Sequence, residues 1–235
     1  MRQRRHGPYT GPAEYHKGSE KFIRIIITAG PTQEPIDPVR FISNRSTGYM
    51  GYKIAEEAFR RGHKTTLISG PTNLTPPKVD DFISIKTADD LLKALKKEIK
   101  KADCLIMCAA VSDFKASKIC HRKIKRGKAL NLKLIPNEDI LKVLSRFHKR
   151  SLFVGFSLET ENLLENSYNK LKNKNLDFVV ANSFTQYHNP FGDNMLDIDL
   201  IDKNGGITKI RHKNKAFIAH VLLDKIEELW YLKNK

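Results

Sequence analysis

The hydrophobic positions of the chain alternate between short continuous runs and longer stretches with helical spacing. The short runs are typical of strands buried on both faces of a parallel sheet, and they cover residues 22–30, 64–70, 82–86, 103–111, 153–159 and 177–183. Stretches with apolar residues every three or four positions predict helices, and they cover residues 48–62, 88–102, 137–147 and 162–175. This alternation predicts an α/β fold with a Rossmann-like, mostly parallel sheet flanked by helices.

Two regions break the alternation and predict additions to the sheet. Residues 113–136 hold a basic loop and then an alternating segment, LNLKLI, which we expect to form a strand that pairs across a two-fold axis. Nearer the C-terminus, residues 195–202 and 207–213 flank an Asn-Gly-Gly turn and predict a β-hairpin. A long amphipathic helix is predicted over residues 214–232.

The length and the ends of the chain indicate how it is organised. A chain of 235 residues suits one large α/β domain, which we expect over residues 22–235. The first 21 residues are basic but lack the apolar core of a signal peptide, so residues 1–21 are expected to form a mobile tail. No apolar stretch reaches 18 residues, and we therefore expect no membrane span.

Cysteine content and charge bear on compartment and partners. Cys104, Cys108 and Cys120 form no CxxC pair, which indicates reduced thiols and a cytoplasmic protein. The net charge of +16 would attract nucleic acid or phosphorylated small molecules, so a basic nucleic-acid-binding module is an alternative to an enzyme. The basic cluster at residues 121–128 contains no aromatic residue to stack on bases, which makes nucleic acid the less favoured partner.

Polar and small residues gather where the predicted parallel strands end. They are TAG at 28–30, AAVSD at 109–113, GFSLET at 155–160 and AN at 181–182. Open α/β sheets bind their ligands outside the carboxyl ends of the strands. These four segments therefore predict a single ligand site.

The segment STGYMG begins a predicted helix with two glycines, Gly48 and Gly51. Free backbone N–H groups at a helix start bind anions, so we predict that this helix start binds the phosphate of a substrate. A Rossmann-type NAD(P)-dependent oxidoreductase is another interpretation. It fits poorly, because Gly30 and Gly48 lie too far apart for a G-x-G-x-x-G turn and the strand at 64–70 ends without an acidic residue for the ribose.

The loop before this helix is long and carries several polar groups. Three prolines stiffen it, and we expect it to hold Arg40, Asn44 and Arg45 over the helix start. A guanidinium suits phosphate or carboxylate, and the Asn44 amide offers uncharged donors; the alternatives are that Asn44 caps a turn and Arg40 is solvated. Further along, Lys170 and Lys174 are spaced to share one helix face, where they would hold an anion between them or simply be exposed.

Together these stretches resemble the phosphopantothenate–cysteine ligase family, also called phosphopantothenoylcysteine synthetase, in a stand-alone form without the decarboxylase domain. The matching segments run from Phe22 onward and are ITAGPTQEPIDPVRFISNRSTGYMGYKIAEEA, LISGP, CAAVSDF, KIK, NEDIL, VGFSLET and KLKNKNLDFVVAN. The resemblance implies a ligase of coenzyme A biosynthesis that joins 4′-phosphopantothenate to cysteine through an acyl-nucleotide intermediate. It also implies a homodimer, CTP rather than ATP as the nucleotide, Mg²⁺ bound with that nucleotide, and no FMN.

The resemblance further implies roles for individual residues. Asn44 and Arg40 correspond to groups that convert the acyl-nucleotide to the amide. Nucleotide-binding residues are implied at Asp113, Lys123, Glu138, Asp139, Ile140, Leu141, Phe156, Lys170 and Lys174. The chain departs from the family pattern at Pro31 and Tyr49, and the resemblance identifies neither metal ligands nor cysteine-binding residues.

Overall fold

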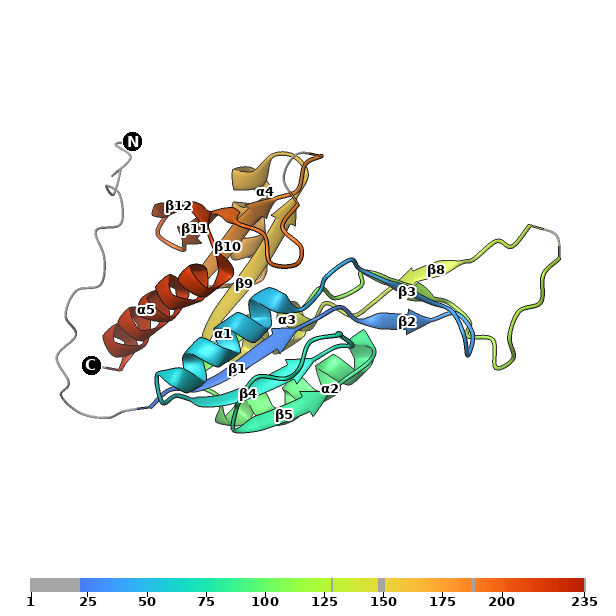
Figure 1. Ribbon diagram of the computed structural model, residues 1–235, viewed down its shortest axis with the longest axis horizontal. Helices are drawn as coiled ribbons and strands as arrows, with labels where there is room; N and C mark the ends of the chain where they lie inside the picture. The colour runs from blue at the N-terminus through green and yellow to red at the C-terminus, as the bar shows by residue number, and fades with distance from the viewer. Residues whose placement is uncertain (1–21, 128, 148–150, 187–188, 235) are drawn as a thin grey trace.

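The computed structural model describes residues 22–127, 129–147, 151–186 and 189–234, so the tail predicted at 1–21 lies outside it. An eight-stranded sheet runs in the order β12-β11-β10-β9-β6-β1-β4-β5 (Figure 1). Six strands pair in parallel, namely β1 (Arg24–Ala29), β4 (Lys64–Ser69), β5 (Asp81–Ser84), β6 (Cys104–Met107), β9 (Leu152–Glu159) and β10 (Phe178–Ser183). The predicted hairpin, β11 (Leu196–Asp202) and β12 (Ile207–Lys213), extends this sheet in antiparallel pairing. The predicted α/β class and mostly parallel sheet are confirmed.

Helices cover both faces of the sheet, as the alternating pattern predicts. One face packs against α1 (Tyr49–Arg60) and α5 (Lys215–Lys233). The other face packs against α2 (Ala88–Glu98), α3 (Ile140–Leu144) and α4 (Leu163–Asn173), with the short 3-10 helices η1 (Ile99–Lys101) and η2 (Ser145–Phe147) after α2 and α3. No helix in the described part of the chain combines the length and apolar character needed to cross a bilayer.

Two predicted elements are shorter than their hydrophobic patterns indicate. The strand expected over 103–111 ends at Met107, because the Thr28 hydroxyl accepts the N–H groups of Cys108 (3.1 Å) and Ala109 (3.0 Å) that would have continued the ladder. The helix expected over 137–147 begins only at Ile140, because the Asp139 side chain caps it by accepting the Lys142 N–H (3.1 Å). As a result, the residues that follow Met107 and those that precede Ile140 lie outside strands and helices, at the carboxyl edge of the parallel strands.

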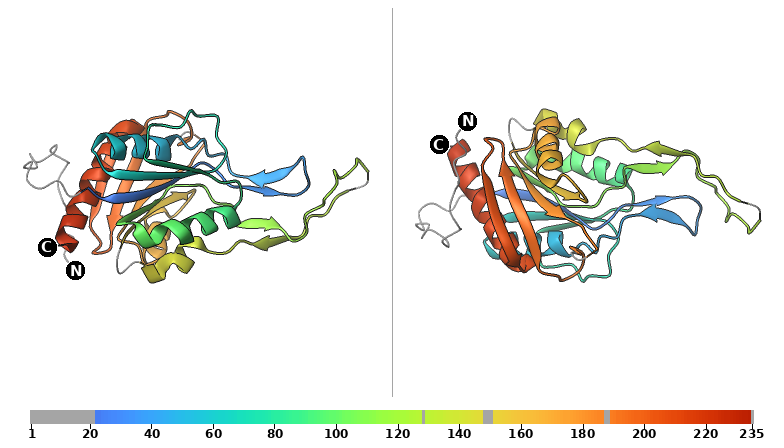
Figure 2. Two further views of the ribbon diagram at one scale, coloured as in Figure 1. Left: turned by 90° about the horizontal axis from the view of Figure 1, so that it is seen from below. Right: turned by 90° about the horizontal axis from the view of Figure 1, so that it is seen from above.

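Two small hairpins project from the body as an arm, formed by residues 33–43 and 114–136 (Figure 2). The first pairs β2 (Gln33–Pro35) with β3 (Phe41–Ser43), and the second pairs β7 (Phe114–Ala116) with β8 (Leu134–Pro136). The strand predicted over LNLKLI is therefore wrong in extent, because only its end pairs, and it pairs with β7 of the same chain. Pairing across a two-fold axis stays a prediction.

Hydrogen bonds from the loop 117–133 hold the two hairpins of the arm together. The Cys120 N–H donates to the Ile36 carbonyl (2.9 Å), and the Ile124 N–H donates to the buried Asp37 carboxylate (3.1 Å). Arg40 donates to the same carboxylate and to the Ile124 carbonyl (2.8 Å). The hydrogen bonds from Arg40 outweigh burial and hold the pKa of Asp37 well below its usual range.

This arrangement corrects the placement expected for Arg40. The proline-rich loop does not lie over the start of α1; it folds into the β2–β3 hairpin, which carries Arg40 out along the arm. The guanidinium meets a buried carboxylate there, so within one chain it stabilises the arm.

Candidate active site

A cleft of about 1110 Å³ opens where β6, β9 and β10 end beside the start of α1. Three of the four strand-end segments predicted to share a site line it, namely AAVSD, GFSLET and AN. The fourth segment, TAG, lies beneath α1, where β1 supports the helix. The carboxyl edge of the sheet therefore forms one ligand-sized cavity, of the kind expected for an open α/β sheet.

Gly48 and Gly51 are required by the way α1 begins and packs. Gly48 is the N-cap residue and has a φ of 80°, in the left-handed region that glycine adopts easily. A Cβ atom on Gly51 would lie 2.6 Å from the Cβ of Ala29, so the helix rests directly on β1. Both glycines line the cleft, and a helix start without a side-chain cap presents N–H groups and a partial positive charge to an anion.

Asn44 lies at the cleft with Arg45 beside it. The Asn44 amide donates to the carbonyls of Ala110 (3.0 Å) and Val111 (3.2 Å), which joins the end of β3 to the loop after β6. The position agrees with the predicted catalytic role, whereas the hydrogen bonds agree with the alternative of a loop-fixing residue. Donation to a substrate oxyanion would require the amide to leave one of the two carbonyls.

Lys170, Lys174 and Asp139 line the end of the cleft beside α4, away from the start of α1. The Lys170 Nζ donates to the Phe156 carbonyl (2.6 Å), and burial lowers the pKa of this lysine. Lys174 forms an ion pair with Asp139. Burial raises the pKa of Asp139, but hydrogen bonds from Lys174 and the Lys142 N–H outweigh this effect and leave it lowered. Two ammonium groups, one of them paired with Asp139, therefore bring positive charge to this end of the cleft.

The other predicted nucleotide-binding residues of this region also line the cleft. Asp113 and Glu138 are exposed, Phe156 is half-buried, and Ile140 and Leu141 are buried at the base of α3. Among the residues that the structure describes, no group of three or more His, Cys, Asp or Glu side chains is arranged to hold a metal ion.

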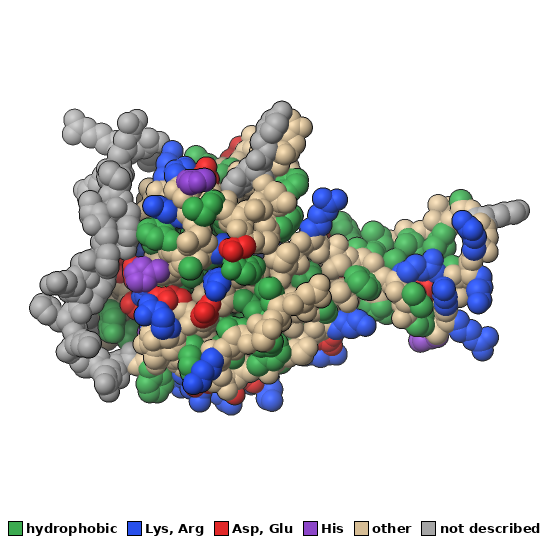
Figure 3. Space-filling model, viewed as in Figure 1, with side chains coloured by type: hydrophobic (Ala, Val, Ile, Leu, Met, Phe, Trp, Pro, Cys, Tyr) green, Lys and Arg blue, Asp and Glu red, His purple; other side chains and the backbone are tan. Residues whose placement is uncertain are grey.

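Arg40 and Lys123 are the two predicted site residues that do not line the cleft. Both lie on the arm, and Lys123 is exposed in the loop 117–133. Lysine and arginine side chains gather at the end of the arm, away from the body (Figure 3). Within a single chain the structure thus separates these two residues from the other predicted nucleotide and substrate contacts.

Sequence reasoning missed several residues that line the cleft, among them Cys108 and Lys215. Cys108 is a free thiol, and burial raises its pKa to about 12, so it is a neutral apolar contact. Lys215 is buried in the first turn of α5. A signal for Lys215 was present, because a lysine directly after the N-cap Asn214 opposes the helix dipole.

Comparisons with known proteins agree with this architecture. A family model for the DNA/pantothenate metabolism flavoprotein C-terminal domain matches residues 21–229. Over 206 residues the chain is 41% identical to a cysteine/cysteine sulfinic acid decarboxylase of an unknown prokaryotic organism, covering 86% of this chain and 57% of that protein. It is 39% identical over 208 residues to the coenzyme A biosynthesis bifunctional protein CoaBC of Haemophilus influenzae, covering 88% of this chain and 52% of that protein. The chain thus spans about half the length of the curated relatives it matches.

Solved structures show the same fold. The crystal structure of the C-terminal domain of a CoaBC bifunctional protein matches with a TM-score of 0.76 and 33% identity, over 91% of this chain and 97% of that one. A Cab2 mutant in complex with phosphopantothenate-cysteine matches with a TM-score of 0.70 and 19% identity, over 89% of this chain and 88% of that one, which supports the fold alone. Because the family model spans nearly all of the described residues, this chain belongs to the DNA/pantothenate metabolism flavoprotein C-terminal domain family.

Proposed function

We propose that this chain is a phosphopantothenate–cysteine ligase of coenzyme A biosynthesis, acting through an acyl-nucleotide intermediate. The observation that carries the proposal is that a single cleft holds an open helix start at Gly48 and, along the sheet, the lysines Lys170 and Lys174. A phosphorylated acid and a nucleoside triphosphate are both anions, so a reaction between them needs two anion sites in one cleft. The relatives named for coenzyme A biosynthesis support the same activity.

In the first half-reaction the carboxylate of 4′-phosphopantothenate attacks the α-phosphorus of the nucleotide. An acyl–phosphate bond forms, the bond to the β-phosphate breaks, and pyrophosphate leaves. Such transfers depend mainly on positioning and charge neutralisation. Lys170 and Lys174 would neutralise the triphosphate, while the start of α1 would hold the phosphate of the acid.

In the second half-reaction the cysteine amine attacks the activated carbonyl, and the nucleoside monophosphate leaves as the amide forms. Negative charge develops on the carbonyl oxygen during this attack. The Asn44 amide lies at the cleft and is proposed to donate to that oxyanion after leaving the Ala110 or Val111 carbonyl.

We propose CTP as the nucleotide, brought in with Mg²⁺. The ion supplies further neutralisation of the triphosphate when bound, and the exposed carboxylates of Asp113 and Glu138 are oxygen donors of the kind it prefers. Neither half-reaction changes an oxidation state, so the proposed chemistry does not use FMN. The three free cysteines agree with a cytoplasmic location.

We also propose a homodimer in which the arm of one chain reaches the cleft of the other. This arrangement would reconcile the predicted roles of Arg40 and Lys123 with their place on the arm, outside the cleft of their own chain. Apolar side chains exposed on the arm support an interface there; they include Val39, Phe41, Phe114, Ile119, Leu130, Leu132 and Leu134.

Mixing two inactive variants tests the dimer. Lys123→Ala alters the arm and Lys170→Met alters the cleft, so each homodimer should have weak activity with a raised nucleotide KM. In a mixed dimer one cleft receives an intact arm, and the mixture should regain about a quarter of wild-type activity if subunits pair at random. Light scattering that gives a monomer mass, or no recovery on mixing, would contradict the arrangement.

The proposed reaction is tested by measuring pyrophosphate release with CTP or ATP, each with and without phosphopantothenate and cysteine. Release should require phosphopantothenate and should be faster with CTP, and amide product should require cysteine in addition. Release that is independent of phosphopantothenate, or absent with both nucleotides, would exclude the proposed ligase.

A further inference from the structure

Lys215 is a buried lysine at the end of the cleft near the start of α1. It is 3% exposed, and its Nζ donates to the Pro190 carbonyl (2.7 Å) and to the Gly192 carbonyl. The side chain lines the cleft among apolar neighbours that include Leu196 and Ile218. An ammonium group in such surroundings is costly unless its charge is compensated.

Lys215 forms no ion pair among the residues that the structure describes: its ammonium donates to the two carbonyls, and Asp193 is the carboxylate near enough to act on its charge. Lys174, by contrast, has Asp139 as its ion-pair partner in the same cleft. An ammonium has three donors, so two carbonyls leave one donor for a further acceptor. Burial lowers the pKa of Lys215, and the charge of Asp193 offsets this effect only in part.

Three contacts connect Lys215 to the start of α1. The Gly192 N–H donates to the Thr47 hydroxyl (3.3 Å), and the Tyr49 N–H donates to the same oxygen (3.4 Å). The Lys215 Nζ lies 5.7 Å from the centre of the Tyr49 ring, within reach of a cation–π interaction. Lys215 and the start of α1 therefore line the same end of the cleft, so an anion bound there would meet both.

We propose that Lys215 binds the phosphate of the phosphorylated acid substrate together with the N-terminus of α1. The inference rests on the proposed function, because it assigns one end of that cleft to the acid and leaves the Lys170 end to the nucleotide. An incoming phosphate would supply a directly bonded anionic partner, which no carboxylate of the described residues gives to Lys215. The lysine thus becomes a specificity-determining residue that favours a phosphorylated acid over the same acid without phosphate.

A purely structural role is the competing explanation, since Lys215 also holds the turn at Pro190–Gly192 against the body. The two roles differ in what a substitution changes. Loss of a phosphate contact weakens binding of one ligand. Loss of a loop anchor lowers thermal stability, or weakens both ligands together as the cleft deforms.

The test compares Lys215→Met with wild type by calorimetric titration of 4′-phosphopantothenate and, separately, of CTP. Lys225→Met is the matched control, because Lys225 lies on the same helix and pairs with Glu228 at the surface. We expect the Kd for phosphopantothenate to rise about tenfold to a hundredfold in Lys215→Met, the range for a hydrogen bond to a charged group. The Kd for CTP and the melting temperature should stay close to wild type, and Lys225→Met should change neither Kd.

Unphosphorylated pantothenate sharpens the test as a competitor of phosphopantothenate. Its inhibition constant should be the same in wild type and Lys215→Met, because it lacks the group that Lys215 contacts. An unchanged phosphopantothenate Kd in Lys215→Met would overturn the proposal, and so would equal weakening of both ligands with a lowered melting temperature. Wild-type protein that fails to bind phosphopantothenate would instead refute the proposed function.

Discussion

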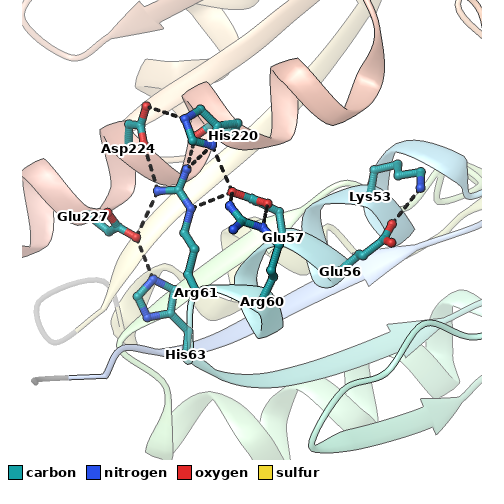
Figure 4. Close-up of polar contacts among 9 residues, drawn as sticks. All are labelled: Lys53, Glu56, Glu57, Arg60, Arg61, His63, His220, Asp224 and Glu227. Carbon is teal, nitrogen blue, oxygen red and sulfur yellow. Dashed lines mark hydrogen bonds and ion pairs between the residues drawn. The ribbon is translucent and has the colours of Figure 1, made fainter. Parts of the chain in front are cut away.

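The packed helices α1 and α5 bury a cation near each end of their contact, and the protein surrounds the two cations differently. Arg61 follows the last turn of α1 and meets carboxylates of Glu57 (2.8 Å), Asp224 (2.8 Å) and Glu227 (3.1 Å) (Figure 4). Lys215, at the first turn of α5, meets only backbone carbonyls among the described residues. Both cations are largely buried, so the difference lies in the partners that the fold supplies.

This difference separates charges that hold the protein together from charges that await a ligand. Around Arg61 the network extends to His63, which contacts Glu227 (2.8 Å), and to His220, which contacts Glu57 (3.0 Å), so the ion pairs are satisfied within the chain. Such a site has little to offer an incoming anion. A buried cation that forms no ion pair among the described residues, such as Lys215 or Lys170, gains more when an anionic ligand arrives.

Removing Arg61 should produce the largest change in stability. Arg61→Met removes the cation that three carboxylates share and leaves them Arg60, His63 and His220 as partners among the described residues, and breaking a buried pair of this kind costs about 3–5 kcal/mol. Chemical denaturation should show the loss, while the Kd values for phosphopantothenate and CTP stay close to wild type. An Arg61→Met variant that is as stable as wild type but binds its ligands more weakly would contradict the assignment of Arg61 to stability and of Lys215 to ligand binding.

The same network should give the protein a dependence on acid. Burial raises the pKa of Glu57, but hydrogen bonds from Arg60, Arg61 and His220 outweigh it and bring the pKa down from 4.5 to about 2. A lowered folded-state pKa gives stability that is present above pH 4.5 and is lost as the pH falls toward 2. Wild type should therefore lose its stability advantage over Glu57→Gln across this range. If the difference in unfolding free energy between wild type and Glu57→Gln stays constant between pH 6 and pH 3, the lowered pKa of Glu57 is not a source of stability.

Asn44→Asp extends the comparison to an uncharged group at the cleft. The change removes both amide donors and adds negative charge near the developing oxyanion, so amide formation should slow by about 10² or more. Acyl-nucleotide should accumulate and be detectable by mass spectrometry after rapid quench, because activation relies on the lysines. Product at the wild-type rate would make Asn44 only the tether to Ala110 and Val111. Loss of both intermediate and product, with both ligands still bound, would move Asn44 to the first half-reaction.

Lys170→Met should have a smaller and more selective effect. The Lys170 ammonium donates to one carbonyl and has donors to spare for a triphosphate, so the nucleotide Kd should rise about 30-fold, the middle of the range for a charged hydrogen bond. The phosphopantothenate Kd and the melting temperature should change little. The exposed Lys172 on the same helix provides the matched control, since Lys172→Met removes equal charge outside the cleft. Equal effects of the two variants would mean that only net charge matters.

Much of the fold follows from local pattern. The apolar runs and helical repeats predicted the parallel strands, the covering helices and the hairpin of β11 and β12, because burial of one face or both faces leaves a periodic trace in sequence. The positions of AAVSD, GFSLET and AN after successive strands also predicted a common cleft, because parallel strands end at the same edge. The spacing of Lys170 and Lys174 predicted that they share one helix face and left open whether they hold an anion; both line that cleft.

Tertiary contacts decided the rest. Thr28 ends β6 early by taking N–H groups from a segment about 80 positions away, and Asp37 draws Arg40 into the arm together with Ile124. Burial of Lys215 depends on carbonyls that lie more than 20 residues before it, so the sequence marked a lysine in an unfavourable position at a helix start but could not show that it is buried. The spacing of apolar residues shows which face of a helix or strand is buried. It does not show whether a buried charged group has a hydrogen-bond or ion-pair partner, because that partner comes from a segment distant in the sequence.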